Sequence, residues 1–326
     1  MLIYGSQSGS TKGDGHMFIA DAHCDTLRAV AVEDIPLEKC SVTPETMAAG
    51  RVGLQTFAMF AGSKGPAGTP YADAVKMIEG IDKLKVPVFT GRLPDAFPET
   101  PSGILSCEGG EIFEGSLERF GELQSRARYR MIALTWNHEN EIAYPAMGGT
   151  KNGLKPFGVQ LLREMDRRGA IADVSHLNEA GFWDVCEKAA LPPMASHSDC
   201  RWLCDVPRNL TREQVKALID RKGFIGVNFY SCFLNADGPA TLEDVVRHID
   251  ALCEMGAEDI VGFGSDFDGI DEWPAELPSP VGFPALMEAL EKRGYSHSQL
   301  EKIAGLNLWR LLKQAEAHAI AAGGIE

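Results

Sequence analysis

Short apolar segments alternate with amphipathic stretches along almost the whole chain. Each apolar segment is too brief to be a helix and several are rich in β-branched residues, so each is predicted to be a buried strand. The eight strand candidates are Met17–Ala22, Val52–Phe60, Gly103–Cys107, Arg130–Thr135, Ala170–Val174, Pro193–Ser196, Phe224–Phe229 and Asp259–Gly264.

The stretches between these segments carry the marks of helices. Tyr71–Leu84 and Phe157–Arg168 place apolar side chains at helical spacing, so each is predicted to bury one face. Polar residues that favour the first position of a helix precede four further stretches, at Thr43, Thr211, Thr241 and Ser296.

Strands that alternate with helices predict a parallel sheet. No Gly-rich nucleotide loop follows the first strand, and no internal repeat or second domain is evident. We therefore expect residues 17–326 to form a single α/β domain, a (β/α)₈ TIM barrel with its active site at the C-terminal ends of the strands. Residues Ser298–Ala321 are predicted to be closing helices.

The first sixteen residues differ from the rest, because they are rich in Gly, Ser and Thr and lack apolar periodicity. Residues Ile3–Thr11 resemble the phosphate-binding loop of flavodoxins, which precedes a helix. Gly13 and Gly15 stand where that helix should begin. We interpret residues 1–16 as a flexible leader or a cloning remnant, and keep a flavin-binding protein as a distant alternative.

Composition narrows the possible functions. The 326 residues are 44% hydrophobic and 24% charged, which is typical of a globular protein, and the net charge of −15 disfavours binding to nucleic acid. No apolar run reaches the roughly 18 residues of a membrane span, and no signal peptide is recognisable. Eight cysteines are too sparse for a disulfide scaffold, so reduced thiols in the cytoplasm are expected. A zinc site built on His197, Cys200 and Cys204 is only weakly indicated, because no second Cys pair completes it.

Metal-capable side chains follow five of the predicted strands. These residues are His23 and Asp25 after the first strand, Glu108 after the third, His176 after the fifth, His197 after the sixth and Asp266 after the eighth. A single histidine at a strand end is most often structural. In a barrel, however, all the C-terminal strand ends converge on one mouth, so these six side chains are expected to meet there.

The spacing of these residues favours a metal centre. His23 and Asp25 share one face of an extended segment, which makes the pair suitable for a divalent cation. Two further imidazoles suit a second ion such as Zn²⁺, and a carboxylate between them can bridge both ions. Neither a nucleophile elbow nor a phosphate-binding loop with a Lys is present.

The motifs together resemble the membrane (renal) dipeptidase family, zinc peptidases of the amidohydrolase superfamily. The matching segments, which run from about residue 17 to the C-terminal helices, are DAHCDTL, SCEGGE, the LTWN run, GLKPFGVQLLREMDRRGAIADVSH, ASHSD, PRNLT, GVNFY and VGFGSDFDGI. The resemblance implies a barrel with a binuclear zinc centre in which a hydroxide that bridges two metal ions attacks the peptide bond of a dipeptide.

The resemblance also implies roles for individual residues. His23 with Asp25 would hold one ion, His176 with His197 the other, and Glu108 would bridge the two. Asp266 would contact the bridging hydroxide and transfer a proton to the leaving amine. Arg208 would bind the free carboxylate of the substrate, and Tyr230 would line the pocket.

One position departs from the family pattern. Many members carry, directly after Leu-Thr, a histidine that contacts the tetrahedral intermediate, whereas here Trp136 follows Leu134 and Thr135. If the segment stays extended, Trp136 and His138 share a face, so His138 is one candidate for that role. The alternative is that Trp136 forms a wall of the pocket and His138 is incidental.

The resemblance leaves several properties open. A related amidohydrolase that acts on another small amide, such as an N-acyl amino acid, is the nearer alternative to a dipeptidase. Zn²⁺, Mn²⁺ and Co²⁺ can share such ligands. A homodimer is the assembly that the resemblance suggests. No nucleic acid and no membrane is expected as a partner.

Overall fold

Eight parallel strands close into one barrel in the computed structural model, which describes residues 17–62 and 68–325. The strands follow one another in chain order around the barrel, and β1 pairs with β8 to close it. Their bounds are β1 Ile19–Cys24, β2 Val52–Phe60, β3 Ser102–Glu108, β4 Met131–Ala133, β5 Ile171–Asp173, β6 Met194–Ala195, β7 Phe224–Val227 and β8 Val261–Phe263. The predicted single (β/α)₈ barrel is confirmed.

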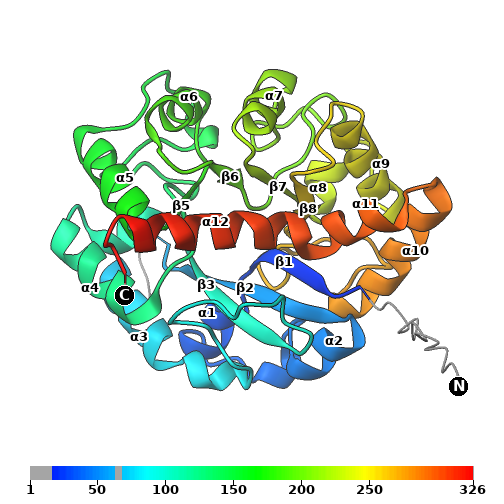
Figure 1. The fold of residues 1–326 in the computed structure, drawn as a ribbon, viewed down its shortest axis with the longest axis horizontal. Helices are drawn as coiled ribbons and strands as arrows, with labels where there is room; N and C mark the ends of the chain where they lie inside the picture. The colour runs from blue at the N-terminus through cyan, green and yellow to red at the C-terminus, as the bar shows by residue number, and fades with distance from the viewer. Residues whose placement is uncertain (1–16, 63–67, 326) are drawn as a thin grey trace, which may run out of the picture.

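Helices follow the strands and form an outer layer around them (Figure 1). Their bounds are α1 Thr26–Ala31, α2 Pro44–Ala49, α3 Pro70–Glu79, α4 Leu117–Ala127, α5 Pro156–Arg168, α6 Glu179–Lys188, α7 Arg212–Asp220, α8 Ser231–Leu234, α9 Leu242–Cys253, α10 Phe283–Arg293, α11 His297–Glu301 and α12 Asn307–Ala321. A single π-helical turn, Lys302–Leu306, joins α11 to α12. The helix starts predicted at Thr43, Thr211, Thr241 and Ser296 are confirmed, and each forms a reciprocal capping box.

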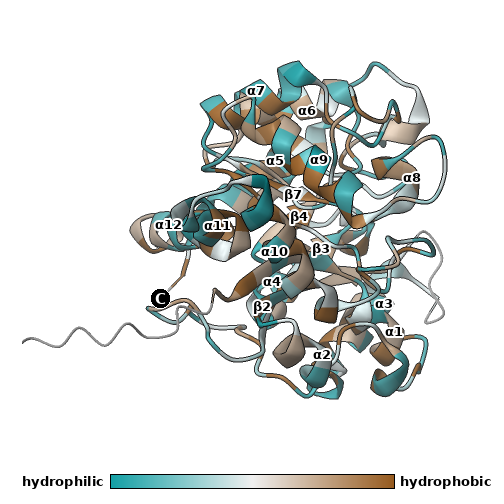
Figure 2. Cartoon of the chain, turned by 90° about the vertical axis from the view of Figure 1, so that its right-hand side faces the viewer, coloured by the Kyte–Doolittle hydropathy of each residue, from teal (hydrophilic) through white to brown (hydrophobic). Residues whose placement is uncertain are grey.

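Strands buried on both faces explain why the sequence shows apolar runs rather than strict alternation. Every residue of β1 and of β3 is buried, as is typical of parallel sheets covered by helices. In Figure 2 brown, hydrophobic stretches gather on the strands and inner helix faces, and teal is prominent on outer helices such as α11. The hydrophobic effect therefore fixes the barrel as the centre of the molecule.

Strand and helix bounds differ from the expected ones for local reasons. β4, β5, β6, β7 and β8 are shorter than predicted, and at their C-terminal ends the residues left out of the sheet contribute to the barrel mouth. β1 instead continues to Cys24, where its end pairs with Phe267. The helix predicted over Tyr71–Leu84 ends at Glu79, before Gly80, and a 3₁₀ turn covers Ile81–Leu84.

The N-terminal end of the barrel is closed by α12. Leu308, Leu311 and Leu312 of this helix are buried in one cluster with side chains from the beginnings of the strands, such as Leu54 and Met131. Figure 1 shows α12 crossing the barrel in red. The opposite, C-terminal end is therefore the end at which a ligand can enter.

Three further predictions concern the first sixteen residues, the state of the cysteines and the absence of a membrane-spanning helix. The predicted leader and its flavodoxin-like loop lie outside the described residues. All eight cysteines are unpaired, as expected; four are buried and Cys232 is exposed. None of the helices in the described part of the chain is both long and apolar enough to cross a bilayer.

The close packing of the strand ends generates a prediction about stability. A Cβ added at Gly226 of β7 would lie 2.0 Å from the backbone oxygen of Ser196, and neither backbone can yield easily. We expect Gly226→Ala to lower the free energy of unfolding by about 1–3 kcal/mol, measured by chemical denaturation. Gly91→Ala is the matched control, because a Cβ there meets nothing within 4 Å. Equal stability of the two variants would contradict this account of the packing.

Candidate metal centre

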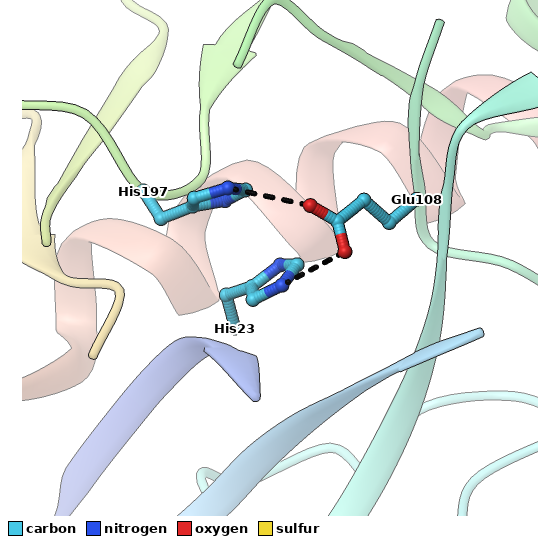
Figure 3. Close-up of side chains that lie close together, drawn as sticks. All are labelled: His23, Glu108 and His197. Carbon is cyan, nitrogen blue, oxygen red and sulfur yellow. Dashed lines mark ion pairs between the residues drawn. The ribbon is translucent and has the colours of Figure 1, made fainter. Parts of the chain in front are cut away.

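Six metal-capable side chains meet at the C-terminal mouth of the barrel, as the sequence predicts. They are His23, Asp25, Glu108, His176, His197 and Asp266, and each is at least nine-tenths buried. Figure 3 shows His23, Glu108 and His197 pointing toward one another from different strand ends. A cluster of this kind excludes water from its charges and therefore needs internal partners.

Glu108 lies between the histidines. Its Oε2 is 3.5 Å from Nε2 of His23, while its Oε1 is 3.0 Å from Nε2 of His176 and 3.6 Å from Nε2 of His197. The two oxygens thus face different imidazoles. This is the arrangement that a carboxylate needs in order to bridge two cations.

The same nitrogen of His23 also lies close to two further carboxylates. Its Nε2 is 3.7 Å from Oδ2 of Asp25 and 3.7 Å from Oδ1 of Asp266. The described residues contain two groups of ligand atoms within 4.8 Å of one another: one from His23, Glu108 and His197, the other from His23, Asp25 and Asp266. Neither group contains a cysteine. The thiols of Cys200 and Cys204 instead contact the backbone oxygens of His248 and Cys232, so the weakly indicated Cys site does not form.

Hydrogen bonds to the outer ring nitrogens fix how two of the imidazoles face the centre. Nδ1 of His197 lies 2.7 Å from Oγ of Ser196, which in turn donates to the carboxylate of Asp173. Nδ1 of His176 lies 2.9 Å from Oδ1 of Asn137. Both Nδ1 atoms therefore carry the proton, which leaves both Nε2 lone pairs directed inward.

The donor set fits bound divalent cations. The Nε2 atoms of His176 and His197 are only 2.9 Å apart, although each presents a lone pair. Nε2 of His23 and Oδ1 of Asp25 are buried and have no hydrogen-bond partner. Imidazole nitrogens and carboxylate oxygens together are typical ligands of Zn²⁺ and related ions.

The backbone turns sharply where it delivers two of these residues. His176 and Asp266 both have φ near 65°, a conformation that non-glycine residues adopt at a cost. The backbone of His176 accepts a hydrogen bond from Ala146, and that of Asp266 donates to His23. These contacts hold both turns and aim the two side chains inward.

Burial and the charges of neighbouring side chains shift the pKa values of the residues in the cluster. Burial, together with the neighbouring charges of Asp25 and Glu108, raises the pKa of Asp266 to about 7. Burial alone would raise the pKa of Glu108, but the charge of His23 and the contact with His176 hold it well below its usual range. Desolvation and the charge of Arg208 lower the pKa of His176 to about 4. Glu108 is thus ionised and His176 neutral near pH 7, as metal binding requires. Although burial opposes it, the charges of Glu108 and Asp25 raise the pKa of His23, so His23 must lose a proton when it binds an ion.

A cavity of about 260 Å³ opens beside the cluster. Asp25, Glu108, His176 and Asp266 line its floor, and the lining also includes Arg208, Tyr230, Trp136 and Asn137. Three of the residues expected to contact substrate, namely Arg208, Tyr230 and Trp136, therefore face the centre.

His138 does not lie where the sequence argument puts it. Its side chain is exposed and contacts the ring of Trp136 at a centroid distance of 5.4 Å, but it does not line the cavity. The segment bends at residues 136–138 instead of staying extended, so Trp136 and His138 do not share the face toward the centre. Asn137, which the sequence argument passed over, faces the cavity instead.

Fold and site together define a metal-dependent hydrolase of the barrel class. Residues 14–323 match the membrane dipeptidase family, peptidase family M19, and the chain belongs to this family.

Curated proteins are similar to this chain, and one of the two described next is named a dipeptidase. It is 40% identical over 222 residues to a Klebsiella pneumoniae protein encoded in the pqqA 5′ region, covering 64% of this chain and 80% of that protein. It is 33% identical over 222 residues to a dipeptidase of Schizosaccharomyces pombe, covering 66% of this chain and 53% of the relative.

Solved structures share the fold over nearly all of their length. The dipeptidase AC, a metallopeptidase, superposes with a TM-score of 0.80 at 25% identity, covering 92% of this chain and 99% of that one. A Rhodobacter sphaeroides metallopeptidase, solved with a phosphinate mimic of the dipeptide L-Ala-D-Ala, gives the same TM-score of 0.80 and the same shares, 92% and 99%, at 23% identity.

The link from Asp173 through Ser196 to His197 predicts the effect of one substitution. Ser196→Ala removes the group that holds Nδ1 of His197, and loss of such a partner typically weakens metal affinity about 10- to 100-fold. Chelator competition measures this change. Ser106→Ala is the control, because the buried Ser106 hydroxyl has no partner. If both variants hold metal as tightly as the wild type, the hydrogen bond does not orient His197.

The position of Glu108 generates a second prediction. An amide cannot neutralise two cations, so Glu108→Gln is expected to lose at least one metal equivalent and most activity. Elemental analysis after dialysis measures the metal content, with Glu111→Gln as a control, since Glu111 is bonded to Asn140 outside the cluster. Two metal ions per chain in Glu108→Gln would count against the bridging role.

Proposed function

We propose that this protein hydrolyses dipeptides with two divalent metal ions, most simply Zn²⁺, held at the barrel mouth. Family membership and the ligand cluster support metal-dependent peptide hydrolysis. The single observation that carries the choice of substrate is the state of Arg208, a buried cation that faces the cavity without an acidic partner.

Arg208 is 5% exposed, and among the described residues no carboxylate lies within ion-pair distance of its guanidinium. Within the described residues its hydrogen bonds go to neutral acceptors, Oγ of Ser198 at 3.3 Å and the backbone oxygen of His197 at 3.2 Å, and its guanidinium lies over the ring of Phe233 at 5.4 Å. Its Nε is buried without a partner. The nearby Asp205 is paired with Arg201 instead. A buried, unpaired guanidinium is costly unless a ligand supplies the anion, and a substrate carboxylate fits that need.

The residues of the metal centre would have different roles in hydrolysis. His23 with Asp25 would hold one ion, His176 with His197 the other, and Glu108 would bridge them. When bound, the two ions would supply a hydroxide nucleophile near neutral pH and Lewis-acid polarisation of the scissile carbonyl. Asp266 would take a proton and return it to the leaving amine. Asn228 holds Asp266 for this purpose through a 3.0 Å hydrogen bond.

An amidohydrolase for N-acyl amino acids remains the alternative, because such substrates also carry the carboxylate that Arg208 would bind. The two functions differ in whether the substrate has a free amine. A dipeptide library that covers both stereochemistries, assayed beside N-acetylated members and C-terminal amides, separates them. The proposal requires rapid hydrolysis of free dipeptides and slow hydrolysis of the N-acetylated forms.

Arg208 generates the prediction that tests the substrate class. Loss of one partner from a buried charged pair costs about 2–5 kcal/mol, so Arg208→Met should lower kcat/KM for dipeptides roughly 30- to 4,000-fold. The metal content should not change. The wild type should prefer a dipeptide over its C-terminal amide by a similar factor, and the variant should lose this preference.

Arg201→Met is the matched control, because Arg201 pairs with Asp205 and does not line the cavity. This variant should retain the wild-type rates on both substrates. Equal wild-type rates on a dipeptide and its amide would rule out the carboxylate role of Arg208.

A further inference from the structure

Asn137 occupies a distinctive place at the barrel mouth. It lies in the bent segment after β4, is exposed, and lines the cavity beside Trp136 and His176. Its side chain contacts the ring of His176, which belongs to the metal cluster. Asn137 is thus both within reach of a bound substrate and attached to the centre.

The contact with His176 fixes the orientation of the Asn137 amide. Nδ1 of His176 must carry a proton if Nε2 is to bind a cation, so Oδ1 of Asn137 is the acceptor of the 2.9 Å hydrogen bond. The other end of the same planar amide, Nδ2, therefore points away from the ring. Its two N–H groups have no acceptor among the described residues.

The buried asparagines of the described chain behave differently. The Nδ2 groups of Asn140, Asn178, Asn209, Asn228 and Asn307 each donate to at least one protein oxygen. Those asparagines use their donors to hold loops or neighbouring side chains. Asn137 differs from them in keeping its donors available on the wall of the cavity.

Peptide hydrolysis is accelerated by a hydrogen-bond donor beside the carbonyl oxygen of the bond that breaks. As the oxygen of water bonds to the carbonyl carbon, the π-electron pair of the carbonyl moves to its oxygen, which becomes negative. That electron pair then re-forms the C=O bond as the C–N bond breaks and its electrons leave on nitrogen. A proton from the water ends on this leaving amine, and the other product is the carboxylic acid. Donors that are already oriented toward the developing negative oxygen stabilise it without reorganising, and asparagine side chains serve in this way.

We propose that Asn137 is a catalytic residue whose Nδ2 donates a hydrogen bond to the scissile carbonyl oxygen as it becomes negative. This assignment rests on the proposed function. Within the cavity, Arg208 is engaged by the substrate carboxylate, and Asn137 is the neutral donor that is fixed directly to a residue of the metal cluster. His138, the neighbour that the sequence argument favoured, faces solvent.

Asn137→Asp separates the two contacts of this side chain. The aspartate keeps an oxygen to accept the proton of His176 but replaces the donor with a second acceptor. We expect kcat to fall about 10²- to 10³-fold while KM changes little and the metal content is unchanged. The affinity for a phosphinate dipeptide analogue, which carries negative oxygens on a tetrahedral centre, should fall by a similar factor.

Two further variants, Asn137→Leu and His138→Ala, serve as comparisons for Asn137→Asp. The leucine removes both contacts, so it should show the same loss in kcat together with weaker metal binding in a chelator competition. His138→Ala is the matched control at the next position and should retain kcat within about threefold.

Two results would overturn the assignment. One is an Asn137→Asp enzyme with kcat and phosphinate affinity close to wild type. The other is a loss of activity that follows loss of metal and is restored by added metal, which would make Asn137 only a support for His176. A wild-type enzyme that holds metal but cleaves no dipeptide would instead refute the proposed function, and this inference with it.

Discussion

Two buried carboxylates beneath the metal cluster hold together the strand ends on which the site depends. Asp21 of β1 accepts hydrogen bonds from the backbone and hydroxyl of Ser265, just past β8, and from Gln55 of β2. Asp173 of β5 accepts from the backbones of Ser175 and Ser196 and from the Ser196 hydroxyl beyond β6. A buried carboxylate without such donors would be very costly, so each one obliges the neighbouring strand to stay in register. The residues that follow these serines, His176, His197 and Asp266, are positioned as a result.

Much of this architecture could be predicted from the sequence. The strands could be predicted because a strand that is buried on both faces requires a continuous apolar run. The helix starts could be predicted because Thr and Ser side chains accept hydrogen bonds from the free backbone N–H groups there. The six metal-capable residues could also be found, since each directly follows a predicted strand and barrel strands end at one mouth. His23 and Asp25 illustrate the point, because His23 lies near the end of β1 and Asp25 directly follows that strand, at the N-cap position of α1.

The rest depends on contacts that have no local signature. The bend at residues 136–138 removes His138 from the cavity and brings Asn137 into it, and nothing in that segment alone indicates the bend. Asn137 is recognised only through its contact with His176, 39 positions further along the chain. Ser196 likewise looks like an ordinary small polar residue at a strand end in the sequence. Its role becomes clear only from its hydrogen bonds to Asp173 and His197. The predicted strand ends near the mouth are wrong for the same reason. Apolar residues there continue the pattern of the strand, although they no longer pair with a neighbouring strand.

The pairing of β1 with β8 has a consequence for how the protein acquires its activity. Asp21 and Ser265 are 244 positions apart, and His23 and Asp266 lie directly beside them. A chain emerging from the ribosome therefore contains only part of the ligand set until nearly all of the barrel has been synthesised. Joining its first and last strands is a contact of very long range, which is slow to form because a large loop must close. The six-residue cluster is therefore complete only once the first and last strands of the barrel have paired.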